Sequence, residues 1–260
     1  MPTIDEPRGL LFSFSDMERE INNMAKMAEP FLENSTIPTK INPWLQQLKS
    51  FRTSPPGKLF NWTIPKDRPV TTKESTGGYE PGGRGRYTVH ATMCSIWQIS
   101  IPNITGQAQK KGQPQANFVL SGKASTRISI FSYDQGNRSE LARWRFEIGN
   151  NDSPGCHFHA QVMGEEGDIV FPKSMSVPRL PNLLFTPMDA IEFVLAEIFQ
   201  DRWKEHASKE TDAIRGWAGC QKRRLINLLK WQQDRLAKNA GSPWTSLKAE
   251  KPHAKLMIDA

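Results

Sequence analysis

The chain has 260 residues, of which 37% are hydrophobic and 23% charged, a composition that excludes a largely disordered chain. No run of about 18 apolar residues is present, which excludes a membrane-spanning helix, and the first residues lack the basic start and apolar core of a secretory signal. Cys94, Cys156 and Cys220 are few and far apart, as is typical of reduced thiols, so the sequence predicts a cytoplasmic protein.

The formal net charge of +7 is confined to the C-terminal part of the chain. Residues 1–201 contain 21 basic and 21 acidic residues, whereas residues 202–260 contain 13 basic and 6 acidic residues, a difference of +7. A local basic excess favours an acidic partner, either nucleic acid or an acidic protein.

Residues 1–52 are predicted to form helices. Ser15-Asp16-Met17-Glu18 has the spacing of a capping box. The apolar stripe that follows it consists of Met17, Ile21, Met24, Ala28 and Phe31. A second helix is predicted from Pro43, with a stripe of Trp44, Leu45, Leu48 and Phe51. Residues 53–86 are rich in Pro and Gly and are predicted to be a connector.

Residues 87–181 show the alternation of an antiparallel β domain, with short turn-rich loops between the alternating runs. Gly122 is expected at a β-bulge. In the clearest predicted strand, 141–148, Trp144, Phe146 and Ile148 share one face, and Arg143, Arg145 and Glu147 share the other.

The predicted sheet is followed by two helices, over residues 182–240, and by a basic tail, 241–260. Thr186-Pro187-Met188-Asp189 combines a cap residue, a proline at the first helical position and an acid at the third. The second helix is predicted over 209–238, with Ile214, Ala218, Leu225, Leu229 and Leu236 on its buried side. The predicted fold class is therefore α+β: an antiparallel sheet or small barrel with N-terminal helices and a C-terminal helical pair.

The stretch from Gly155 to Val162 is the best candidate for chemistry. In an extended strand, His157, His159 and Gln161 share one face and Phe158, Ala160 and Val162 the other. The first face is expected to contact water, a metal or a ligand, and the second to pack. The simplest interpretation is a sheet face with hydrogen-bonded polar side chains.

Residues 157–163, His-Phe-His-Ala-Gln-Val-Met, resemble the signature of the histidine triad superfamily, in the branch with glutamine at the third position. That branch includes galactose-1-phosphate uridylyltransferase and the dinucleoside polyphosphate phosphorylases. The resemblance covers about seven residues. It implies a nucleotidyl hydrolase or transferase in which His159 attacks an α-phosphate, His157 supports it and Gln161 hydrogen-bonds a phosphate oxygen.

The order of His157, His159, an acid at Glu165 and then Gly167-Asp168 is also similar to the first motif of cupin barrels, which implies a divalent metal. In this chain the acid comes late, and no later histidine falls on a predicted strand. We therefore predict no metal or other cofactor.

The run from 155 to 203 resembles uncharacterised bacterial proteins, to which no activity is attached. The leading hypothesis is a cytoplasmic bacterial binding protein, without catalysis, that engages nucleic acid or an acidic protein through its basic C-terminal helix. The residues predicted to carry that charge are Arg215, Lys222, Arg223, Arg224 and Lys230. The alternatives are a nucleotidyl enzyme that uses His159, and a protein–protein interaction subunit of a larger complex.

Overall fold

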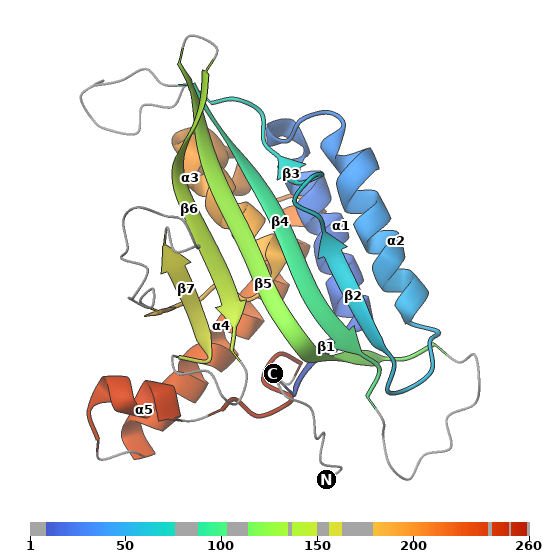
Figure 1. Cartoon of the computed structure of the whole chain (residues 1–260), viewed down its shortest axis with the longest axis vertical. Coiled ribbons are helices and arrows are strands. Elements are labelled where there is room, and N and C mark those ends of the chain that lie inside the picture. The colour runs from blue at the N-terminus through green and yellow to red at the C-terminus, as the bar shows by residue number, and fades with distance from the viewer. Residues whose placement is uncertain are drawn as a thin grey trace.

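An open antiparallel sheet with helices on one of its faces organises the fold (Figure 1). The structure, a computed structural model, describes residues 9–75, 88–102, 114–134, 137–149, 156–162, 179–238, 241–249 and 251–258. The α+β class is as predicted, and of the two predicted forms of the sheet the open one is observed rather than a closed barrel.

The sheet has eight strands in the order β2-β4-β5-β6-β7-β8, and β1 also pairs with β5 and β3 with β4. Their bounds are β1 Leu10–Ser13, β2 Leu59–Ile64, β3 Val70–Thr71, β4 Thr88–Ser100, β5 Asn117–Asp134, β6 Asn137–Ile148, β7 Phe158–Val162 and β8 Leu180–Pro181. The register between β4 and β5 shifts beside Gly122, where an added Cβ would lie 2.7 Å from Cβ of Gln98. The irregularity predicted at Gly122 is therefore confirmed.

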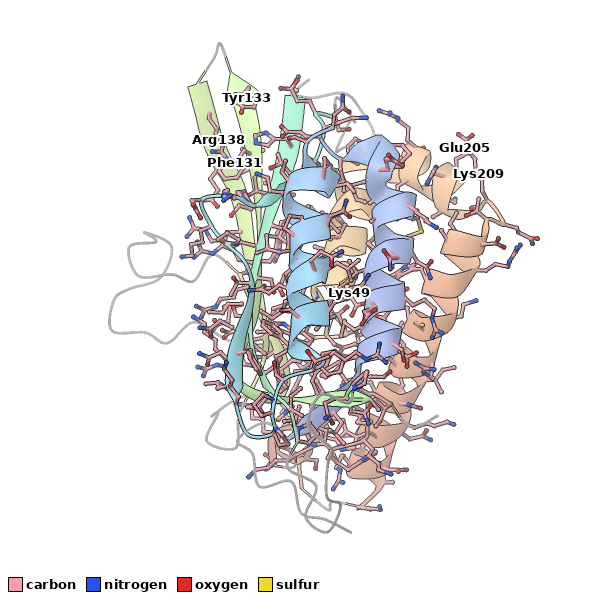
Figure 2. All side chains as sticks on the ribbon, turned by 90° about the vertical axis from the view of Figure 1, so that its right-hand side faces the viewer. Lys49, Phe131, Tyr133, Arg138, Glu205 and Lys209 are labelled. Carbon is pink, nitrogen blue, oxygen red and sulfur yellow. The ribbon has the colours of Figure 1, made fainter. Side chains whose placement is uncertain are left out.

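The helices of the described residues are α1 Phe14–Ala28, α2 Asn42–Phe51, α3 Pro187–Ala207, α4 Asp212–Lys238 and α5 Pro243–Ala249. Seen from the side, α2 and α1 lie next to one another on one face of the sheet, and α4 packs on the far side of α1 (Figure 2). Alternate strand residues point into this layer, because successive side chains of a strand point to opposite faces. In β4 they are Val89, Ala91, Met93, Trp97 and Ile99.

The capping residues in the sequence predict where the helices start to within two residues. Thr186 Oγ1 accepts the N–H of Asp189 and Asp189 accepts the N–H of Thr186, so the predicted cap of α3 is present in full. The predicted apolar stripes of α1 and α2 are buried. The cap of α1 is Ser13, which accepts the N–H of Asp16 at 3.2 Å, two residues before the predicted cap at Ser15.

Three predicted segments differ from the structure. The connector predicted over 53–86 contains β2 and β3 in its described part, since Trp62 and Ile64 are buried at alternate positions of a strand; residues 76–86 lie outside the described residues. The tail predicted over 241–260 contains α5 and packs back on the fold, where the N–H of Leu11 donates to the Ala254 carbonyl at 2.7 Å. The third differing segment is α4, described next; the short edge strand that the sequence also predicts at 170–171 lies outside the described residues.

A buried ion pair joins α1 to α4 and explains the third difference. Arg224, only 2% exposed, donates to the carboxylate of Glu20, which is fully buried. Burial raises the pKa of Glu20 and of the neighbouring Asp189; it lowers that of Arg224, but the two carboxylates outweigh burial and keep it above its ordinary value. The buried side of α4 is therefore Trp217, Cys220, Arg224, Leu228 and Trp231, and the predicted stripe is wrong because Leu229 and Leu236 are exposed.

The two edges of the sheet are closed in different ways. On β2, the Gln47 side chain donates to the Asn61 carbonyl at 3.1 Å and accepts the N–H of Thr63 at 3.2 Å. At the other edge, β8 is two residues long and ends in Pro181, which has no N–H. Two outward backbone groups of β2 are thus occupied, and one N–H group of β8 is absent.

Candidate functional site

The strand that carries the histidines has the predicted alternation but a different environment. His159 and Gln161 lie on the face of β7 opposite to Phe158, which packs against Phe185 and Trp231 under the helices. This face was expected to contact water, a metal or a ligand, and contact with water is not observed at His159, which is 2% exposed. In the neighbouring strands β6 and β8, Glu147 and Pro181 lie opposite His159.

Each ring nitrogen of His159 lies near an oxygen atom, and only Nδ1 does so with hydrogen-bond geometry. Nδ1 lies 2.9 Å from the carbonyl oxygen of Cys156, which can only accept, so Nδ1 carries the hydrogen. Nε2 lies 3.3 Å from Oε2 of Glu147. Gln161 accepts from Nε of Arg145 at 2.9 Å. In the described part of the chain the imidazole therefore lies between two oxygen atoms and is 2% exposed.

The pKa of the Glu147 carboxylate depends on these contacts. Burial alone would raise its pKa, but the hydrogen bond to His159 and the charge of Arg145 hold it below the ordinary value. A carboxyl group with a depressed pKa stabilises the folded state above its unfolded pKa, about 4.3, and this stabilisation is lost as the pH falls through the folded pKa.

Glu147→Gln is therefore expected to lower the free energy of unfolding at about pH 5, and the difference from the natural chain is expected to shrink toward pH 3. Urea unfolding at a series of pH values measures this difference. Glu205→Gln, which removes an exposed carboxylate from α3, is the control for loss of one negative charge. A difference that stays constant from pH 5 to pH 3 would contradict the role assigned to Glu147.

The alternative of a metal at His157 and His159 gains no support from the part of the chain that is described. There, no group of three or more histidine, cysteine, aspartate or glutamate side chains is arranged to hold a metal ion. Glu165, the predicted third ligand, lies outside the described residues.

The five predicted cations of α4 do not form one accessible surface. Arg224 is in the buried pair with Glu20, so its place in a partner surface is wrong. Arg223 lies 2.9 Å from Asp16 of α1, and Arg215 binds Asp212 and the Glu210 carbonyl. Lys222 and Lys230 are exposed. Carboxylates on α1 and at the start of α4 thus neutralise much of the predicted surface.

A different basic surface lies on the face of the sheet that no described helix covers (Figure 1). It consists of alternate residues of β5 and β6, which the register places side by side: Cys94, Arg127, Arg145 and Gln161 form one row across β4 to β7. The cations of this face are Lys123, Arg127, Arg138, Arg143 and Arg145, and its carboxylates are Glu140 and Glu147. We call these residues, with His90, Phe131 and Tyr133, the open face.

The centre of the open face is hollowed. A cavity of about 350 Å³ is lined by Lys66, Lys123, Arg127 and Arg145, together with Cys94 and residues of β2, and no described carboxylate lines it. Burial and the guanidinium groups of Arg143 and Arg145 lower the pKa of Arg127. Arg143 and Arg145 are also in ion pairs with Glu140 and Glu147, and an anion in the hollow would add a further interaction with Arg127 and Arg145.

Aromatic side chains occupy one end of the open face. The His90 ring stacks on Phe131 and on Tyr133, with centroid distances of 5.4 and 5.0 Å. The guanidinium of Arg138 lies 3.5 Å from the centre of the Phe131 ring. Tyr133 is 40% exposed, and it lies with Phe131 and Arg138 near the tip of the β5–β6 hairpin (Figure 2).

The signal that could have identified the open face is the alternation of the strands. Lys123, Arg127, Phe131 and Tyr133 are separated by even numbers of residues in β5, as are Arg143 and Arg145 in β6. The shared face of Arg143, Arg145 and Glu147 was predicted. Its connection to β5 needed the strand pairing, because the relevant neighbours are far apart in the sequence.

Comparisons of the chain with protein-family models, with curated proteins and with solved structures gave no match. Among the helices of the described residues, none has both the length and the apolar character needed to cross a bilayer.

Proposed function

We propose that the protein is a non-catalytic binding protein of the cytoplasm that holds single-stranded nucleic acid on the open face of its sheet. The observation that carries the proposal is the combination, on one uncovered face, of a cationic hollow and a group of stacked aromatic rings. Proteins that bind single strands combine a cationic track for the phosphates with aromatic rings on which bases stack. The free thiols of Cys94, Cys156 and Cys220 favour a reducing compartment.

The aromatic end of the open face favours nucleic acid over an acidic polypeptide. Carboxylates need only the cations, whereas a base gains from the exposed ring of Tyr133 and from the guanidinium of Arg138. The proposed partner is a single strand and not a duplex, because an unpaired strand presents both its bases and its phosphates to a sheet.

Lys123→Gln combined with Arg127→Gln is expected to weaken binding of a labelled single-stranded oligonucleotide about tenfold or more, because each cation pairs with phosphate. Tyr133→Ala is expected to weaken it about fivefold or more through loss of stacking. With three to four phosphate contacts, the slope of log affinity against log salt should be about −2 to −3. Fluorescence anisotropy at several salt concentrations measures all three quantities.

The matched control is Lys222→Gln combined with Lys230→Gln, which removes the same charge from the exposed side of α4. It should change affinity no more than about twofold. If this pair reduces binding and the open-face pair does not, the interface lies on α4 instead. If polyglutamate competes as well as the oligonucleotide, the partner is an acidic protein. Absence of binding at low salt to any single strand would overturn the proposal.

A further inference from the structure

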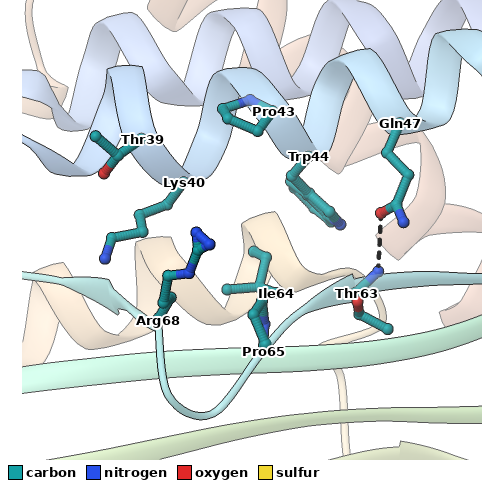
Figure 3. A pocket seen from close by; sticks show the side chains of 9 residues that line it. All are labelled: Thr39, Lys40, Pro43, Trp44, Gln47, Thr63, Ile64, Pro65 and Arg68. Atoms are coloured by element: carbon teal, nitrogen blue, oxygen red, sulfur yellow. Dashed lines mark hydrogen bonds between the residues drawn. The ribbon is translucent and has the colours of Figure 1, made fainter.

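A second cavity lies on the other side of β2, between α2 and the turn that follows β2 (Figure 3). Its volume is about 280 Å³, near the lower limit of small-molecule sites. Lys40 and Trp44 line it from the helical side, and Ile64, Pro65 and Arg68 from the side of the strand and turn. It shares Thr63, Ile64 and Pro65 with the hollow of the open face and has no cation in common with it.

Trp44 provides a buried donor that has no acceptor. Its side chain is directed from α2 into the cavity, and the residue is 3% exposed (Figure 3). One face of the indole stacks on Trp62 with ring centroids 4.2 Å apart, yet Nε1 has no hydrogen-bond partner. A buried N–H group without an acceptor is unfavourable, so an acceptor atom of a ligand at this point would stabilise the complex.

The polar side chain of Gln47, close to Trp44, does not accept a hydrogen bond from the indole N–H. The Gln47 amide makes two hydrogen bonds to the backbone of β2, since it donates to the Asn61 carbonyl and accepts from the Thr63 N–H. The dashed line in Figure 3 marks the second of these bonds. The indole N–H is therefore an unused donor beside a side chain that is held in place.

Two cations lie at the opposite end of the cavity. Lys40 comes from the turn before α2, and Arg68 from the turn after β2, and both extend into the space between the helix and the strand (Figure 3). No described carboxylate pairs with either of them, and none lines the cavity. A guanidinium beside an ammonium matches a dianionic phosphate. Between the two ends the walls are apolar, with Pro43, Ile64 and Pro65.

We propose that this cavity binds a phosphate monoester, with the phosphate between Lys40 and Arg68 and a planar body in contact with Trp44, whose Nε1–H donates to an acceptor atom of that body. The ligand class is that of a nucleoside monophosphate. This site does not depend on the open face, which lies across β2 and uses other cations.

The test is an NMR titration of the full chain, labelled with ¹⁵N at tryptophan, with cytidine 5′-monophosphate as the probe. The indole signal that is missing in Trp44→Phe identifies Trp44. We expect the nucleotide to shift this signal, and cytidine and inorganic phosphate to bind at least about tenfold more weakly. Arg68→Gln should weaken binding of the nucleotide about tenfold and Trp44→Phe about fivefold.

Trp244→Phe, which alters an exposed ring, and the open-face pair Lys123→Gln with Arg127→Gln should leave the titration unchanged. Arg68 is exposed and distant from the core, so its variant tests the site even if Trp44→Phe does not fold. No shift of the Trp44 signal at about 10 mM nucleotide would overturn the proposal. Equal affinity for cytidine, or for inorganic phosphate, would also overturn it, because the phosphate or the body would then contribute nothing.

Discussion

Replacement of Arg224 by methionine is expected to lower the free energy of unfolding by about 3–5 kcal/mol, the cost of removing one partner of a buried ion pair. The substitution leaves Glu20 fully buried between α1 and α4, with Asp189 also buried close by. These carboxyl groups would then lack the charge that compensates for their burial. Urea unfolding followed by circular dichroism measures the loss.

The double variant Glu20→Leu with Arg224→Met is expected to recover most of that stability, because an apolar pair of similar volume avoids the cost of buried charge. Lys230→Met, on the exposed side of the same helix, should change stability by no more than about 0.5 kcal/mol. If Arg224→Met were as mild as Lys230→Met, Arg224 would have to point to solvent, and α4 would be rotated relative to the structure described above.

Trp62→Ala is expected to cost about 3–5 kcal/mol, as is usual for the loss of a large aromatic side chain from a core. Trp62 is fully buried, stacks on Trp44, and meets the ring of Trp97 edge to face at a centroid distance of 5.8 Å. Its Nε1 also donates to the Trp44 carbonyl at 3.0 Å, which ties β2 to α2. The unfolding midpoint in urea reports the effect.

Trp244→Ala is the matched control, since that tryptophan is 60% exposed on α5 and should contribute no more than about 0.5 kcal/mol. Trp62→Phe keeps most of the packing and removes the hydrogen bond, so its cost should lie between those of the two alanine variants. Equal costs for Trp62→Ala and Trp244→Ala would show that β2 does not pack under α2.

The parts of the fold that follow from the sequence are those set by neighbouring residues. The start of α3 depends on Thr186, Pro187 and Asp189, which lie within one turn, and it was predicted correctly. The cap of α1 was misplaced because Ser13 and Ser15 each have an acid three residues later, and local pattern does not distinguish them.

The parts that did not follow depend on partners far away in the chain. An arginine in a helix is ordinarily assigned to the exposed side, and Arg224 is buried only because Glu20, 204 residues earlier, is buried with it. Arg224 lies on the same side of α4 as the buried residues Trp217, Leu228 and Trp231, and Leu229 and Leu236 are exposed. The burial of Arg224 also removes the centre of the basic surface that the sequence predicted.

The sequence predicted which residues share a strand face at the candidate site, but not which faces are covered in the fold. The alternation of β7 and the shared face of Arg143 and Arg145 follow from the period of a strand. Whether such a face is open depends on what covers it, which a strand pattern does not contain. The histidine face was expected to contact water, a metal or a ligand, and in the structure His159 is buried, with Nδ1 near the Cys156 carbonyl and Nε2 3.3 Å from Glu147.

Gln47 and Pro181 affect how the edges of the sheet can pair with another chain. A fibril grows when a free strand edge templates the backbone of another chain. The amide of Gln47 occupies two of the groups that such a chain would need on β2, and Pro181 lacks one on β8. Copies of this protein that meet at high concentration therefore find few sites for cross-β propagation on either of these strands.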